Sequence, residues 1–214
     1  MIDETESQPT EENKETGRVE AFSDGVFAIA ITLLVLNIQV PHDLPVGKSL
    51  AGALIDQWPT YLAFVTSFAT IGIMWINHHR LFTHILRSDN TLLVLNGLLL
   101  MGITVVPFAT ALLAAYIGHP DEQVAALVYG GTLVLIAIFF NVLWLYASHG
   151  RRLLDRKADE GSVRAITRQY RVGPLLYLAG FLLAFVNVPL SIGTYLLLAL
   201  YFALPGSAID RARG

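Results

Sequence analysis

Polar and ionisable residues stand at the start of the first apolar stretch of this sequence. Arg18, Ser23 and Asp24 directly precede the run GVFAIAITLLVL, which continues with few polar residues to position 40. An ionisable group at the edge of hydrocarbon is costly unless it is paired or lies on a path for water or ions. These residue types therefore indicate either an ion or proton site or a hydrogen-bonded network between helices.

Polar side chains also end the second apolar stretch and begin the third. Consecutive membrane spans alternate in direction, so all of these side chains come to one membrane surface. Groups without access to water must satisfy one another there. The residues concerned are Arg18, Ser23, Asp24, Trp75, Asn77, His78, His79 and Asn96.

Arg18 and Asp24 lie six residues apart, which is about 240° around a helix of ~3.6 residues per turn. They do not face each other on one helix, so each needs a partner on another helix. We expect those partners among Asn77, His78 and Asn96, in a network that holds the first helix against the second and third. The competing interpretation is a proton or ion relay through Asp24 and His78.

Other chemistry finds little support in the sequence. His78, His79 and His84 have no Cys, Asp or Glu beside them at ligand spacing, and we predict no metal site. Ser23 has no base at a suitable spacing, and glycine-rich phosphate loops, HExxH and GxSxG are absent. We therefore expect no enzyme and no cofactor. The basic run Arg151–Arg171 is more typical of anionic lipid contact and orientation than of nucleic-acid binding.

Composition places these residues in a membrane protein. Of 214 residues, 54% are hydrophobic and 14% are charged, and the mean hydropathy is +0.57. Soluble domains carry about 25% charged residues. We expect a disordered acidic tail over residues 1–17, a membrane domain over residues 18–205 and a short tail over residues 206–214.

Six apolar segments are each close to the length that spans a bilayer, which predicts an all-α integral membrane protein. Only Pro189 and its neighbours separate the last two, which predicts a tight helical hairpin. The segments are Phe22–Val40, Leu54–Asn77, Thr91–Ile117, Gln123–Ser148, Gly173–Val188 and Leu190–Leu204.

The basic residues predict the orientation of these spans. With the N-terminus in the cytoplasm, thirteen of the 14 Lys and Arg residues fall on cytoplasmic segments, and only Lys48 lies outside. An even number of spans then places both termini in the cytoplasm. We expect a multi-pass protein of the cell membrane.

The first span carries one stripe of side chains that shares a helix face. Small residues at Gly25, Ala28 and Ala30 allow close approach of neighbouring helices. Periodicity alone does not distinguish a stripe that faces lipid or a packed neighbour from one that lines a pore. The stripe consists of Ile29, Thr32, Leu33 and Leu36.

The motif Arg18-xxx-Phe22-Ser23-Asp24 at the start of the first span resembles the signature of the lysosomal potassium channel family (transmembrane protein 175). The following run GVFAIAITL and the end of the second span, Trp75-Ile76-Asn77-His78-His79, share the resemblance. It covers nearly the whole chain from Arg18. The single six-helix unit is similar to the bacterial and archaeal members.

The resemblance implies a homotetramer in which four copies of the first helix line a central potassium-conducting pore. It implies that Ile29 forms a hydrophobic constriction, that Leu33 and Leu36 continue the pore wall, and that Thr32 contributes to selectivity. With no carbonyl filter, K⁺/Na⁺ selectivity is expected to be modest and the gate hydrophobic. The residues implied to hold the pore helix are Arg18, Phe22, Ser23, Asp24, Trp75, Asn77, His78 and Asn96.

Two alternatives remain beside a channel for monovalent cations. One is a proton-coupled transporter that uses Asp24 and His78. The other is a scaffold that conducts nothing and in which the motif is purely architectural. The partners expected of the channel are further copies of the chain, membrane lipids and monovalent cations, and not nucleic acid.

Overall fold

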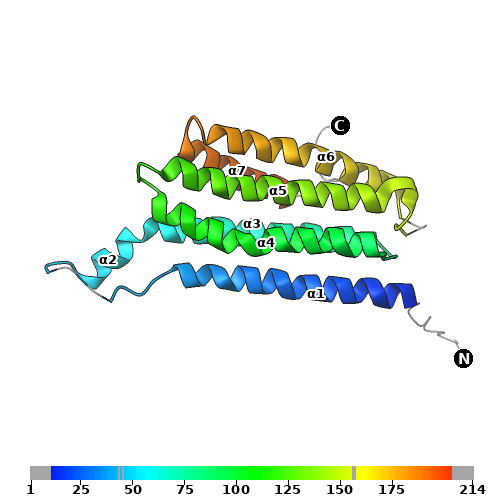
Figure 1. Cartoon of the computed structure of the whole chain (residues 1–214), viewed down its shortest axis with the longest axis horizontal. Coiled ribbons are helices and arrows are strands. Elements are labelled where there is room, and N and C mark those ends of the chain that lie inside the picture. The colour runs from blue at the N-terminus through cyan, green and yellow to red at the C-terminus, as the bar shows by residue number, and fades with distance from the viewer. Residues whose placement is uncertain (1–10, 43, 45, 156–157, 204–214) are drawn as a thin grey trace, which may run out of the picture.

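The computed structural model describes every residue except 1–10, 43, 45, 156–157 and 204–214. The described residues form helices and one isolated bridge, Ile85 to Leu154. The long helices lie side by side in one bundle, with α1 at one edge and α6 and α7 at the other (Figure 1). The elements are α1 (Glu11–Leu33), η1 (Leu34–Asn37), α2 (Leu50–Asp56), α3 (Trp58–Phe82), α4 (Asn90–Tyr116), α5 (Glu122–Ser148), η2 (His149–Arg151), α6 (Glu160–Leu183) and α7 (Val188–Ala203).

Four described helical segments are long and apolar enough to cross a membrane: Glu15–Asn37, Trp58–Phe82, Asn90–Tyr116 and Glu122–Arg151. The chain is thus an all-α membrane protein. By the same criterion α6 and α7 fall short, because α6 carries arginines through its first half and α7 has only 16 residues. The predicted third and fourth segments match α4 and α5 to within one residue, whereas the predicted second segment, Leu54–Asn77, begins in α2 and ends five residues before α3 does.

Several predicted boundaries differ from the structure. The fifth segment is the second half of α6, which begins at Glu160 and makes residues 160–171 helical instead of a loop. The hairpin turn lies at residues 184–187, so Pro189 falls in the first turn of α7, where proline is well tolerated. The predicted hairpin is therefore present, but its turn precedes the proline.

The first helix also differs from its prediction at both ends. It begins at Glu11, inside the range expected to be a disordered tail, while residues 1–10 and the predicted tail 206–214 lie outside the described residues. Thr16 is buried, and its hydroxyl donates to the carbonyl oxygen of Leu86 at 3.1 Å, which ties this early part of α1 to the loop after α3. At the other end, the α-helix stops at Leu33 and η1 carries the chain to Asn37 instead of Val40.

Side-chain amides satisfy backbone carbonyls beside the two prolines inside helices. Pro174 has no N–H for the carbonyl oxygen of Tyr170, and the Asn141 side chain donates to that oxygen at 2.6 Å instead. The Asn37 side chain donates to the carbonyl oxygen of Pro107 at 3.3 Å. Unpaired backbone groups are costly in hydrocarbon, so the Asn141 amide allows Pro174 to remain within the bundle. The Asn37 bond does not replace a partner in this way, because the carbonyl that Pro107 leaves unpaired is that of Ile103, and this bond ties η1 to α4 instead.

A carboxylate fixes the start of α4 on the side of the loop after α3. Asp89 caps the helix by accepting from the backbone N–H of Leu92 at 2.9 Å and from the Tyr146 hydroxyl at 2.7 Å. Arg152 approaches the same carboxylate at 3.4 Å. Burial alone would raise the pKa of Asp89, but these hydrogen bonds and the guanidinium together lower the pKa below its usual value. The carboxylate therefore holds α4 to α5 at neutral pH.

The side chain of Tyr195 on α7 packs into a gap left by two glycines. A Cβ atom at Gly130 of α5 would overlap the Tyr195 hydroxyl oxygen, and one at Gly180 of α6 would lie 2.7 Å from its ring. Both glycines and Tyr195 are buried. The close approach of α5, α6 and α7 thus depends on these two missing side chains.

We expect Gly130→Ala to lower the free energy of unfolding by about 1–3 kcal/mol, because it overpacks a filled interior. Thermal unfolding of the purified protein measures the change. Gly131→Ala is the matched control, since its Cβ would lie 3.6 Å from Phe181, an ordinary contact. Tyr195→Phe removes the overlapping oxygen and should rescue Gly130→Ala in part, since the ring carbon that remains would lie 3.1 Å from the added Cβ. Equal melting temperatures for the two alanine variants would contradict the packing argument.

Open face of the first helix and its polar support

One side of α1 and η1 is open in the single chain. We call this side the open face. The opposite side packs against α3 and α4 through Phe27, Ala30 and Leu34, all 1% exposed or less. The open face contains Phe22, Ile29, Thr32, Leu33 and Leu36, and its apolar members are 41–70% exposed. The stripe predicted from periodicity therefore lies on one face, with Leu36 in η1 and not in the α-helix.

Thr32 is the polar residue of the open face and lies near its middle. Its hydroxyl donates to the carbonyl oxygen of Ile29 at 2.9 Å, within the same helix. A hydroxyl that donates in this way keeps lone pairs with which to accept. Thr32 can therefore present an oxygen ligand to a cation or a water molecule in front of the open face.

A chain of hydrogen bonds links the buried side of α1 to α3 and α4. Asn96 on α4 stands at its centre: its amide donates to Ser23 Oγ at 2.9 Å and its oxygen lies 2.9 Å from His78 Nε2. The Ser23 hydroxyl in turn donates to the carbonyl oxygen of Val19 at 2.8 Å. All three side chains are at most 3% exposed. The predicted network between the first three spans is thus present through these residues.

The direction of these bonds assigns the tautomer of His78. The Asn96 oxygen can only accept, so His78 Nε2 carries the proton and Nδ1 does not. Nδ1 is buried and has no hydrogen-bond partner among the described residues. The ring instead lies against Phe82, with centroids 4.4 Å apart, and Phe27, at 5.4 Å. A second proton on Nδ1 would have no acceptor, so the contacts favour a neutral, structural histidine.

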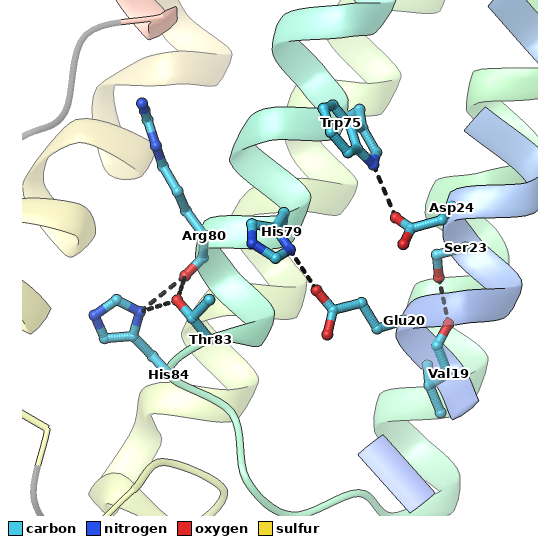
Figure 2. Close-up of polar contacts among 9 residues, drawn as sticks. All are labelled: Val19, Glu20, Ser23, Asp24, Trp75, His79, Arg80, Thr83 and His84. Atoms are coloured by element: carbon cyan, nitrogen blue, oxygen red, sulfur yellow. Dashed lines mark hydrogen bonds and ion pairs between the residues drawn. The ribbon is translucent and has the colours of Figure 1, made fainter. Parts of the chain in front are cut away.

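Two further contacts join α1 to α3 one turn apart (Figure 2). Trp75 Nε1 donates to Asp24 Oδ1 at 2.8 Å, and His79 Nδ1 lies 2.6 Å from Glu20 Oε1. The two carboxylates and the two rings each lie four residues apart, so each pair shares one face of its helix. Glu20 was not among the residues predicted to form the network. Its position one turn before Asp24, on the same helix face, is the signal that could have identified it.

Three residues predicted to join the network are outside its hydrogen bonds between α1, α3 and α4: Arg18, Phe22 and Asn77. Asn77 makes no hydrogen bond to a described residue of α1 or α4: its amide donates to the carbonyl oxygens of Ile73 and Phe202, which ties α3 to α7. Arg18 and Phe22 are exposed and line an open groove with Leu93 of α4, and no hydrogen bond or ion pair joins Arg18 to another described residue. The expected partners of Asp24 were also wrong, since its bond goes to Trp75.

The first helix thus has one open face and one side held to α3 and α4. Among the described residues there is no group of three or more His, Cys, Asp or Glu side chains that could hold a metal ion. The hydrogen bonds to Ser23, Asp24 and Glu20 lie before Thr32 in the sequence, and the Asn37 amide of η1 adds a further bond to α4 beyond it. The packed side of α1 and η1 is thus held along its length by these bonds and by Phe27, Ala30 and Leu34, whereas the open face is left free.

Comparison with known proteins gives consistent matches over most of the chain. A family model described as the endosomal/lysosomal potassium channel TMEM175 matches residues 18–107. A potassium channel of Chamaesiphon minutus is 57% identical over 198 residues, or 92% of this chain and 98% of that protein. A potassium channel of Streptomyces collinus is 47% identical over 190 residues, or 88% of this chain and 91% of that protein.

A solved structure agrees with these matches. The crystal structure of a lysosomal potassium-selective channel TMEM175 homolog from Chamaesiphon minutus superimposes with a TM-score of 0.82 at 54% identity, covering 90% of this chain and 98% of that one. The family is one of ion channels and not of enzymes, as the sequence predicted. Because the likeness extends over nearly the full length of these relatives, the chain belongs to the TMEM175 family.

Proposed function

We propose that this protein is a potassium-permeable cation channel whose pore is walled by the open face of α1 from several copies. The observation that carries the proposal is the contrast between the two sides of this helix. One side is fastened to α3 and α4 by buried hydrogen bonds, while Ile29 on the other side is 59% exposed. The buried bonds fix the rotation of α1 about its own axis and so keep this exposed side turned outward.

A single open face cannot enclose a passage, so the proposal requires an oligomer. Four copies, as the resemblance implies, would bring four open faces together around a central axis. The small residues Gly25 and Ala28 lie on the exposed side of α1 and allow close approach there. The names of the two bacterial relatives, both potassium channels, support K⁺ as the permeant ion.

The proposed orientation has six spans and both termini in the cytoplasm of a cell-membrane protein. The distribution of Lys and Arg supports it. The structure is compatible, because the last turn of α3 contacts both Glu20 near the start of α1 and Ala203 at the end of α7. These ends of α1 and α7 therefore lie at the same end of the bundle.

The proposed gate is a hydrophobic ring of Ile29 side chains, with Leu33 and Leu36 continuing the wall. A ring of this kind closes a pore by excluding water, and small helix movements widen it. The Thr32 hydroxyls lie one turn from Ile29 and supply the oxygen ligands that the apolar wall lacks. Selectivity for K⁺ over Na⁺ is expected to be modest, because no ring of backbone carbonyls replaces the hydration shell.

The contacts give no support to a proton-coupled transporter that uses Asp24 and His78. Asp24 bonds to Trp75, whereas His78 bonds to Asn96 and has a buried Nδ1 with no described acceptor. A relay needs a continuous path of groups that exchange protons. The observed bonds run instead from α3 through α4 to the backbone of α1.

Flux measurements on the reconstituted protein test the proposal. In vesicles loaded with K⁺, with the proton gradient abolished by buffer on both sides, we expect passive K⁺ efflux that does not saturate. Flux that requires a proton gradient would contradict the channel and favour the transporter. No flux from protein that still elutes as an intact oligomer would favour the non-conducting scaffold.

A further inference from the structure

The outer side of α6 carries a basic stripe, which we define as Arg164, Arg168 and Arg171. All three are exposed. At roughly 100° per residue, these positions share one helix face with Leu175, Leu178 and Leu182 further along. The three leucines are 38–65% exposed, while the opposite side of α6 is buried through Tyr170, Gly173 and Tyr177 among others. One outward face thus changes from basic to apolar between Arg171 and Leu175.

The boundary between the basic and the apolar part of this face lies where the membrane surface would cross α6. The arginine-free part of the helix, residues 172–183, is about 18 Å long at ~1.5 Å per residue. The hydrocarbon core of a bilayer is about 30 Å thick. An α6 that lies in the bilayer therefore holds Arg171 at the headgroup level or below it. A guanidinium there needs an anionic partner or must thin the bilayer locally.

The described part of the chain supplies no such partner for Arg171. No carboxylate among the described residues pairs with it, and the acidic residues of α6 are at the start of the helix. Asp159 caps that start: the backbone N–H and hydroxyl of Ser162, the backbone N–H of Gly161 and the positive charge of Arg164 lower its pKa, so Arg164 is the stripe residue nearest to a carboxylate. Glu160 faces Arg151 at 3.6 Å. Both acids lie about 17 Å along the helix from Arg171, beyond the ~10 Å Debye length at 0.1 M salt.

We propose that the basic stripe binds the phosphate of an anionic phospholipid whose acyl chains lie along the leucines of the same face. The guanidinium fork matches phosphate oxygens bidentately, which favours arginine for this contact. α6 lies at the edge of the bundle away from α1, so the lipid would contact the periphery and not the pore-helix face (Figure 1). The inference rests on α6 lying in the bilayer, as proposed above, but not on conduction.

Native mass spectrometry of the full-length protein in detergent, titrated with dioleoyl phosphatidylglycerol or dioleoyl phosphatidylcholine, tests the proposal. We expect preferential retention of phosphatidylglycerol. Arg171→Gln and Arg164→Gln should each weaken that retention about fivefold, the effect of one basic residue near an anionic surface. Lys48→Gln, on the loop predicted to lie outside, removes one positive charge elsewhere and should leave retention unchanged. Arg171→Lys keeps the charge but not the fork, and we expect an intermediate loss.

The outcomes that overturn the proposal are distinct from failure of the channel. Equal retention of the two lipids, or equal effects of Arg171→Gln and Lys48→Gln, would show that the stripe is not a specific site. Displacement of phosphatidylglycerol by an equal concentration of inorganic phosphate would show that free phosphate, and not lipid, occupies it. If Arg171→Gln fails to fold, Arg171→Lys and Arg164→Gln carry the same comparison. None of these results depends on K⁺ flux.

Discussion

Replacing Ile29 with asparagine is expected to increase K⁺ efflux from vesicles about tenfold. The proposed constriction excludes water because branched aliphatic side chains surround the axis. An amide ring at this level would hold water and lower the barrier that a hydrated cation meets. A fall of about 1.4 kcal/mol in that barrier corresponds to a tenfold faster flux. The measurement is the initial rate of K⁺ efflux per oligomer, together with the K⁺/Na⁺ ratio, which should fall.

A matched variant separates a pore effect from a general leak. Leu197 on α7 is 68% exposed, comparable to Ile29 at 59%, and lies on a helix that packs against α3, α5 and α6. Leu197→Asn therefore introduces the same amide at an exposed apolar site without touching the proposed pore wall. Unchanged flux in Ile29→Asn, with the oligomer intact by gel filtration, would remove Ile29 from the constriction. Equal increases in both variants would indicate a leak through disturbed packing.

Long apolar runs made the middle of the fold predictable. α4 and α5 begin and end within one residue of their predicted segments, because polar or turn-forming residues flank each uninterrupted run. The N-terminal half of α6 was not predictable in this way. Its arginines alternate with residues that pack inward, such as Gln169 and Tyr170, so hydropathy alone shows a charged loop where packing forms a helix.

The sequence predicts how deep the network residues lie in the membrane, but not the direction in which each side chain points. Sequence position correctly placed Ser23, His78 and Asn96 near one level, where they form one chain of bonds. Asn77 lies at the same level, but one residue is a rotation of about 100° on a helix, which turns its side chain toward α7. Depth follows from counting residues along a span. Direction depends on which neighbour packs on each side, and the sequence of one span does not contain that information.

Asn96→Leu is expected to lower the free energy of unfolding by about 1–3 kcal/mol. The substitution leaves the Nε2–H of His78 buried without an acceptor, and an unpaired buried donor loses its full solvation. It also removes the donor to Ser23 and so loosens α1 from α4. Thermal unfolding of the reconstituted or detergent-solubilised protein measures the loss, with unfolding of wild type in the same lipid or detergent as reference.

A second substitution distinguishes a structural network from a proton relay. His78→Phe removes the orphaned donor, and a phenyl ring suits a site already lined by Phe27 and Phe82. When both hydrogen-bond partners become apolar, most of the cost disappears. The double variant should therefore be more stable than Asn96→Leu alone, with a coupling energy of about 0.5–3 kcal/mol for residues in contact. Additive losses would mean that the bond does not couple α3 to α4.

The same pair of variants decides what His78 does for transport. If its imidazole only fastens helices, His78→Phe with Asn96→Leu keeps passive K⁺ flux, since the open face of α1 is untouched. If protons pass between Asp24 and His78, the double variant loses transport even where its melting temperature is restored, because a phenyl ring carries no proton. In that case the double variant would recover its melting temperature without recovering transport. The observed bonds, which end on a backbone carbonyl of α1 and leave Nδ1 enclosed by aromatic rings, favour retained flux.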